Sequence, residues 1–241
     1  MLEPQVKADA FLDARYYLNR QHRTLAEGVE GWLVNMEELL ACWPPWHDFS
    51  GLLTKRERQR WCDYQTIVDD GLRARSFLFG RSVLRLLLAD RLEVSPDQVP
   101  LTRDAHGKPQ LENSCLHFNL SHSGEWLWLV ISSLGPVGAD VECLLTCEPV
   151  TEALIEMVAS PEEQRTLRQA PASKRDIVFL RLWVLKETYL KAIGSGLLQD
   201  PRLLKINDDN TISHIYKFNN PLCSQIAFIQ TDSCIVAWAQ L

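Results

Sequence analysis

A segment of about twenty residues in the second half of the chain is apolar on most of its sides, and this pattern restricts the fold more than any other. Residues 174–193 are predicted to form one long helix that ends at Gly194. A helix of this kind is normally buried. Lys186, Glu187 and Lys191 nevertheless lie within it. Because buried charges need partners, the sequence predicts a core helix with a polar site along it.

A second long helix is predicted over residues 70–91, where leucine and phenylalanine form a broad buried face. Thr54 and Glu57 have the spacing of a capping box, and Ser160 is placed to cap a helix whose first residue is Pro161. The predicted strands lie between and after these helices, at 116–120, 126–132, 137–143, 212–218, 225–230 and 234–239.

Helices followed by strands occur in both parts of the chain, and this order indicates an α+β fold with a duplicated plan. We expect an N-terminal half over residues 31–137 and a C-terminal half over residues 138–241. Residues 1–30 are polar and mixed in character. They are predicted to form an N-terminal extension or a poorly ordered arm.

The charge and the apolar runs argue against two classes of function. The chain has 25 basic and 31 acidic side chains, a net charge of −6, which disfavours nonspecific nucleic-acid binding. Its longest apolar run, residues 126–131, is far shorter than the ~20 residues of a membrane span. With no signal peptide pattern and seven scattered cysteines, the chain is expected to be cytoplasmic with reduced thiols.

Two acids in the sequence VGADVEC have the spacing of a metal site. On a strand, Asp140 and Glu142 project from the same face. Two neighbouring carboxylates resist joint ionisation unless a cation lies between them, and oxygen ligands suit magnesium. An exposed strand end with two solvated acids would also explain the pair, and more simply.

The predicted core helix strengthens the case for a metal. Glu187 and Lys191 are four residues apart and share a helix face, so a simple salt bridge would account for them. It would account less well for Lys186. A carboxylate with two cations, facing the two acids of the strand, fits a site for a metal ion and a diphosphate.

Four segments together resemble one known family. Residues 138–142 match G-x-D-x-E, and residues 183–192 match W-x-x-K-E-x-x-x-K-A. Two further segments, GKP at 107–109 and FNLSHS at 118–123, follow the same pattern. In this order and spacing they resemble the Sfp-type 4′-phosphopantetheinyl transferases, over residues 31–241.

The resemblance implies a monomer of two similar α/β halves, related by a pseudo-twofold axis, with coenzyme A in the cleft between them. It implies that Asp140, Glu142 and Glu187 bind Mg²⁺, with Glu142 the least secure ligand. Arg73 and Arg81 match the family only approximately, through the basic residues of the helix predicted over residues 70–91. With the residues carried over by motif, those expected at coenzyme A are Arg73, Arg81, Arg103, Gly107, Lys108, Pro109, Ser121, His122, Lys186 and Lys191.

The implied reaction moves phosphopantetheine from coenzyme A to a serine of an apo acyl or peptidyl carrier protein. Asp140, Glu187 and Lys191 are the expected catalytic residues, with Glu187 as the base. The carrier is expected to dock around residues 144–158. Two alternatives stay open: a magnesium-dependent nucleotide-diphosphate hydrolase, which needs only water as acceptor, and a non-catalytic module that binds coenzyme A.

Overall fold

The computed structural model describes residues 4–42, 52–67, 71–146, 149–195, 199–207, 212–214 and 225–241, and side chains are described from residue 13 onward except at 212–214. Its α-helices are α1 (Pro4–Gln21), α2 (Met36–Cys42), α3 (Lys55–Gln65), α4 (Gly71–Leu92), α5 (Glu152–Val158), α6 (Pro161–Gln169) and α7 (Ala172–Ile193). Short 3-10 turns lie at Pro96–Gln98 and Pro201–Leu203.

The strands of the N-terminal half are β1 (His22–Ala26), β2 (Val29–Asn35), β3 (Leu101–Arg103), β4 (Pro109–Leu111), β5 (His117–Ser123) and β6 (Trp126–Ser132). Those of the C-terminal half are β7 (Val137–Cys143), β8 (Leu204–Ile206), β9 (Ile212–His214), β10 (Gln225–Gln230) and β11 (Cys234–Gln240). Residues 215–218 of the strand predicted at 212–218 lie outside the described residues.

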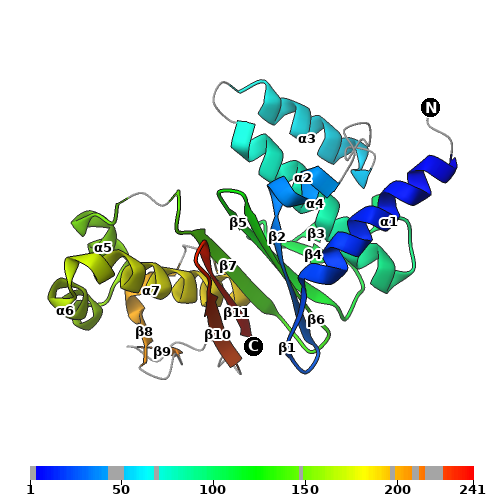
Figure 1. Cartoon of the computed structure of the whole chain (residues 1–241). Coiled ribbons are helices and arrows are strands. Elements are labelled where there is room, and N and C mark those ends of the chain that lie inside the picture. Colours follow the sequence, from blue (N-terminus) through cyan, green and yellow to red (C-terminus); the bar gives the residue numbers. More distant parts are fainter. Residues whose placement is uncertain are drawn as a thin grey trace.

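Each half packs one long helix on an antiparallel sheet (Figure 1). In the N-terminal half, α4 contacts strands of the sheet β1-β2-β6-β5. In the C-terminal half, α7 lies on the sheet β10-β11-β7. Both helices have 22 residues. The expected α+β fold of two similar halves is therefore confirmed.

The two sheets share an apolar core at their junction. Trp128 of β6 is fully buried, and its indole Nε1 donates to the carbonyl oxygen of Ala237 in β11 at 2.7 Å. At the last residue of β11, Ser132 Oγ donates to Gln240 Oε1 at 2.7 Å. Side chains of β2 and β6 pack there against those of β7 and β11. The halves are joined by a core rather than by a linker.

Of the two expectations for residues 1–30, an N-terminal extension or a poorly ordered arm, the second does not fit the part that the structure describes. Helix α1 buries Tyr17 and Leu18 in the core of the N-terminal half. Strand β1 then pairs with β2, so one hairpin spans the boundary that we expected at residue 30. The sequence of α1 is polar on average, and its place is set by these contacts with the rest of the half.

The predicted ends of the helices are largely as expected. Thr54 and Glu57 form a capping box at α3, and Ser160 and Glu163 form one at α6. Gly194 ends α7 in the left-handed conformation, with φ +75°. Among the helices that the structure describes, none combines the length and apolar character needed to cross a membrane.

Candidate active site

Strand β5 supplies a hydroxyl group to each of the two acids of β7. Ser121 Oγ donates to Asp140 Oδ1 at 2.8 Å, and Ser123 Oγ donates to Glu142 Oε2 at 2.8 Å. Residues two apart on a strand share a face, so both pairs lie on the same side of the junction between the halves. The predicted placement of Asp140 and Glu142 on one face of a strand is confirmed.

Asp140 is buried, with its side chain 5% exposed, and its two oxygens have different surroundings. Lys191 Nζ donates to Oδ1 at 2.5 Å and to Ser121 Oγ at 3.0 Å. The other oxygen, Oδ2, is buried and has no hydrogen-bond partner. A buried carboxylate oxygen without a partner is costly, and a bound cation would satisfy it.

Glu142 has partners for both of its carboxylate oxygens. Trp183 Nε1, from α7, donates to Oε1 at 3.1 Å, and Ser123 holds Oε2. Burial raises the pKa of Glu142; the Ser123 hydrogen bond opposes that rise, and the Asp140 charge adds to it. The two protein donors leave Glu142 less available to a cation than its neighbour Asp140.

Glu187 projects from α7 toward the same acids. Burial raises the pKa of its carboxyl, the Lys191 charge lowers it, and the charges of Asp140 and Glu142 raise it further. The charges of both strand acids therefore reach the carboxyl of Glu187. The oxygen Oε1 of Glu187 is buried without a hydrogen-bond partner.

Gly138 allows α7 to approach β7 this closely. A Cβ atom at this position would lie 1.8 Å from the carbonyl oxygen of Thr188 and 2.6 Å from the backbone nitrogen of Ala192. No side chain fits there, so the helix backbone rests directly on the strand. The glycine of G-x-D-x-E thus brings Glu187 to Asp140, without taking part in the chemistry itself.

Two of the three acids expected to bind magnesium have oxygen atoms that fit this role. Asp140 Oδ2 and Glu187 Oε1 are unpaired oxygens of buried acids, which are the ligands that magnesium prefers. Among the residues with described side chains, however, no three of the His, Cys, Asp and Glu residues already form a metal cage. Asp140 and Glu187 are the better-placed pair. Ligation by all three acids stays a prediction.

For the magnesium site that the sequence predicts, the raised pKa of Glu187 implies that protons compete with the metal at higher pH than at an ordinary glutamate. Because its carboxyl protonates at higher pH than an ordinary glutamate, the carboxylate needed for binding is lost earlier as the pH falls. Below that pKa, the half-saturating magnesium concentration should rise about tenfold per pH unit. Magnesium titrations from neutral pH downward measure this, and a flat profile down to the pKa of an ordinary glutamate would contradict it.

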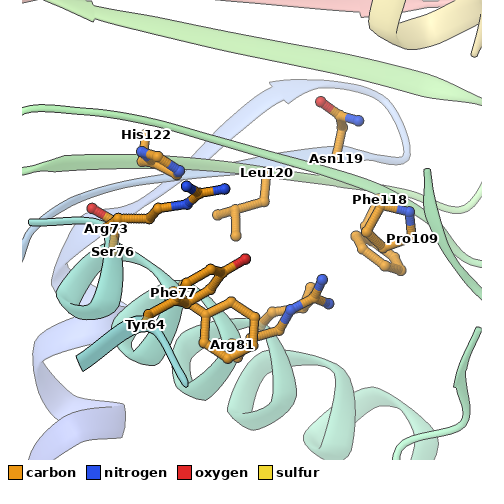
Figure 2. A pocket seen from close by; sticks show the side chains of 12 residues that line it. Tyr64, Arg73, Ser76, Phe77, Arg81, Pro109, Phe118, Asn119, Leu120 and His122 are labelled. Carbon is orange, nitrogen blue, oxygen red and sulfur yellow. The ribbon is translucent and has the colours of Figure 1, made fainter. Parts of the chain in front are cut away.

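A cavity of about 320 Å³ lies between α4 and β5 (Figure 2). It contains four of the residues expected at coenzyme A, namely Arg73, Arg81, Pro109 and His122. The complete lining is Tyr64, Arg73, Ser76, Phe77, Gly80, Arg81, Leu84, Pro109, Phe118, Asn119, Leu120 and His122. Cationic and apolar side chains in one pocket suit a ligand with a ring and a phosphate.

His122 forms part of this cavity and links it to the acids. Its ring and the side chain of Arg73 both line the cavity (Figure 2). Burial lowers the pKa of His122 and the Lys191 charge lowers it further, whereas the Asp140 charge raises it. The ring is therefore mainly neutral at pH 7, and it can offer a hydrogen bond without adding charge.

A second cavity, of about 550 Å³, shares Phe77 and Arg81 with the first. Arg103 lines it, together with further arginines of α3 and α4, which are Arg56, Arg60 and Arg85. Arg85 is committed to Glu57, at 2.8 Å, and to backbone carbonyls. Several arginines of α3 and α4 are thus concentrated around these two cavities.

Tyr64 and Phe77 are cavity residues that the sequence analysis missed. Their rings meet edge to face with centroids 5.4 Å apart. The Arg73 guanidinium lies 4.8 Å from the Tyr64 ring centre, and that of Arg81 lies 5.8 Å from the Phe77 ring centre. Aromatic residues between arginines in a basic stretch were the available signal, but their spacing does not distinguish ring stacking from core packing.

Lys186 does not join the acids, contrary to its expected place at the phosphates. Its ammonium is fully buried on another side of α7, where it contacts Glu163 at 2.6 Å and the carbonyl oxygen of Val158 at 3.0 Å. Successive helix residues point about 100° apart, so Lys186 and Glu187 cannot face the same site. Lys186 fastens α6 to α7.

The GKP segment forms a turn against the end of α7. Gly107 has φ +86°, and Arg103 donates to its carbonyl oxygen at 2.6 Å. The ammonium of Lys108 is bound to backbone carbonyls of the C-terminal half rather than directed into the cavity of Figure 2. The resemblance implied that Lys108 lies at the adenosine phosphate end of coenzyme A, and this placement does not support that expectation.

Comparisons with known proteins agree on one family. A model described as the 4′-phosphopantetheinyl transferase superfamily matches residues 136–236, and a model of the N-terminal part of 4′-phosphopantetheinyl transferases matches residues 42–134. A putative 4′-phosphopantetheinyl transferase of Synechocystis sp. is 34% identical over 79% of this chain and 80% of its own length. The 4′-phosphopantetheinyl transferase HetI of Nostoc sp. is 33% identical over 68% and 70%.

Proposed function

The chain belongs to the 4′-phosphopantetheinyl transferase superfamily, and on that basis we propose that it transfers the phosphopantetheine arm of coenzyme A to a serine of an apo carrier protein. The observation that carries the proposal is the meeting of Asp140, Glu187 and Lys191 at the junction of the halves. Family membership favours transfer over hydrolysis or simple binding. We expect the protein to act as a cytoplasmic monomer.

The negative charge of coenzyme A fits the cationic side chains of the two cavities and of the acid site. The arginines of the two cavities, Arg73, Arg81 and Arg103, would hold the phosphorylated adenosine end. Lys191, held by Asp140 and Ser121, would contact the diphosphate. This arrangement explains a basic region in a chain with a net charge of −6.

The reaction joins the serine oxygen of the carrier to the phosphorus that bears pantetheine. The bond from that phosphorus to the bridging diphosphate oxygen breaks, and adenosine 3′,5′-bisphosphate leaves. Asp140 and Glu187 would hold Mg²⁺, which supplies charge neutralisation to the diphosphate when bound. Lys191 offsets the charge that grows on the leaving group.

Glu187 is the residue placed to take the proton of the attacking serine. A catalytic base works best when its pKa lies near the operating pH, and burial moves the pKa of Glu187 in that direction. A carboxylate has two oxygens, so one oxygen of Glu187 could hold the metal while the other takes the proton. Glu142, whose oxygens already accept from Ser123 and Trp183, is less suited to this role.

Two exposed apolar side chains lie in the segment where we expect the carrier to dock. Leu145, just after β7, is 77% exposed, and Met157 of α5 is 57% exposed. Residues 147–148 of the docking segment predicted at 144–158 lie outside the described residues. The nearby Arg168 and Arg175 pair with Glu152, so we propose that apolar contacts dominate on this face.

The test is the intact mass of a carrier protein. Incubation with coenzyme A, magnesium and an apo carrier should add one phosphopantetheinyl group, and a carrier whose acceptor serine is alanine should gain nothing. A hydrolase would instead release adenosine 3′,5′-bisphosphate without any carrier. A binding module would leave coenzyme A and the carrier unchanged, and either of these outcomes would overturn the proposal.

A further inference from the structure

Lys108 holds together the two elements that carry the acids of the site. Its ammonium donates to the carbonyl oxygens of Lys191, at 2.5 Å, and Ala192, at 3.3 Å, in the last turn of α7. It also donates to the carbonyl oxygen of Val137, the first residue of β7, at 3.2 Å. One cation of the N-terminal half therefore fastens both the end of α7 and the start of β7.

The last turn of α7 has a physical need for such a cation. The final four carbonyl groups of a helix have no partner within the helix, and the helix dipole makes this end electronegative. Lys108 satisfies two of these carbonyls and adds a favourable charge. Burial lowers the pKa of Lys108 to about 8, so the charged form still predominates at pH 7.

Hydrogen bonds within the turn that carries Lys108 fix the direction of its side chain. Asp104 Oδ1 accepts from the backbone nitrogens of His106, at 2.9 Å, and Lys108, at 2.8 Å. The backbone nitrogen of Asp104 donates in turn to the carbonyl oxygen of Lys108 at 3.0 Å. With Gly107 in the left-handed region, these bonds set the direction of the lysine before it reaches the helix.

We propose that Lys108 is a positioning residue, which fixes Glu187 and Lys191 relative to Asp140 instead of binding the substrate's phosphates. Lys191 lies in the helix turn whose carbonyls Lys108 holds, and Glu187 lies one turn earlier. Movement of that turn would displace both side chains from Asp140. This inference rests on the proposed function and assigns to Lys108 a role opposite to the one that its motif implies.

The two roles predict different kinetics for Lys108→Met. A positioning role predicts that kcat falls about tenfold or more, because a small misplacement of catalytic groups is costly, while the KM for coenzyme A stays within about twofold. A phosphate-binding role predicts the reverse, a raised KM with kcat retained. Lys174→Met, which removes an exposed lysine from the first turn of α7, is the matched control and should leave both constants unchanged.

Hydrogen exchange supplies a readout that does not depend on activity. In Lys108→Met, backbone amides in the last turn of α7 should exchange about tenfold faster, while those in the middle of the helix keep their protection. Lys108→Arg keeps a cation and should retain most of the protection and of kcat. If Lys108→Met does not fold, the kinetics of Lys108→Arg test the proposal instead. A raised KM for coenzyme A with unchanged kcat in that variant would overturn the proposal.

These outcomes separate the inference from the proposed function. Failure of the wild-type protein to load a carrier would remove the proposed function, whereas the exchange experiment would still test the contact with α7. Normal loading by wild type together with unchanged exchange in Lys108→Met would overturn the inference alone.

Discussion

Replacing Asp140 with asparagine is expected to lower the rate of carrier loading by about 10³-fold, the scale of losses seen when a transition-state charge loses its partner. Asparagine has nearly the same shape, and it can still accept from Ser121 and Lys191. It removes the negative charge and presents a donor where the unpaired Oδ2 now lies. Binding of magnesium should weaken in parallel.

Glu187→Gln should lower the rate of carrier loading by a similar factor, because it removes both a ligand oxygen and the proposed base. Asp176→Asn is the matched control, since Asp176 is an exposed acid on the same helix. Initial rates from intact carrier masses, with thermal melting to verify folding, measure all three variants. Loading by Asp140→Asn at more than about a tenth of the wild-type rate would contradict the assigned role.

Gly138→Ala is expected to destabilise the protein by about 3 kcal/mol, near the upper end for overpacking in a core. The added methyl group would lie 1.8 Å from the carbonyl oxygen of Thr188, and a backbone atom cannot move aside as a flexible side chain can. The helix must shift away from β7. We therefore expect the variant that folds to bind magnesium weakly, because Glu187 moves with the helix.

Gly71→Ala is the matched control for this substitution. No atom lies within 4 Å of a Cβ atom built at Gly71, so alanine should be neutral or slightly stabilising there. Urea unfolding of both variants measures the difference in free energy. A Gly138→Ala protein as stable as wild type would show that α7 and β7 do not pack in this way.

The common face of the acids and the positions of the helix ends could be predicted because each depends on residues that are close together in the sequence. The spacing of Asp140 and Glu142 on a strand fixes a common face, and a capping box such as Thr54 with Glu57 needs only four residues. The i and i+4 spacing of Glu187 and Lys191 likewise places both on one side of a helix. These features follow from chain geometry alone.

The directions of Lys186 and Lys108 could not be obtained in the same way. Which side of α7 faces Asp140 is decided by how the helix lies on β7, and Lys186 then faces α6 and Glu163. Lys108 reaches the end of α7, more than eighty residues away in sequence. Motif matching assigned both lysines to phosphates because a motif gives residue types without the partners that tertiary packing provides.

The N-terminal region was missed for a related reason. Helix α1 has a mixed, polar sequence, and β1 becomes a strand through its pairing with β2. Tyr17 gains a place in the core and donates through its hydroxyl to the carbonyl oxygen of Asn35 at 3.2 Å. Propensity alone gave no sign of these contacts.

The central claim is that acids from β7 and α7 converge on one divalent cation. The most direct measurement is a crystal structure with coenzyme A and Mn²⁺, in which anomalous scattering locates the metal. The account predicts a single peak bound by Asp140 and Glu187, in contact with the diphosphate. A peak bound elsewhere, or a diphosphate seated next to Lys191 with no metal at either acid, would contradict it.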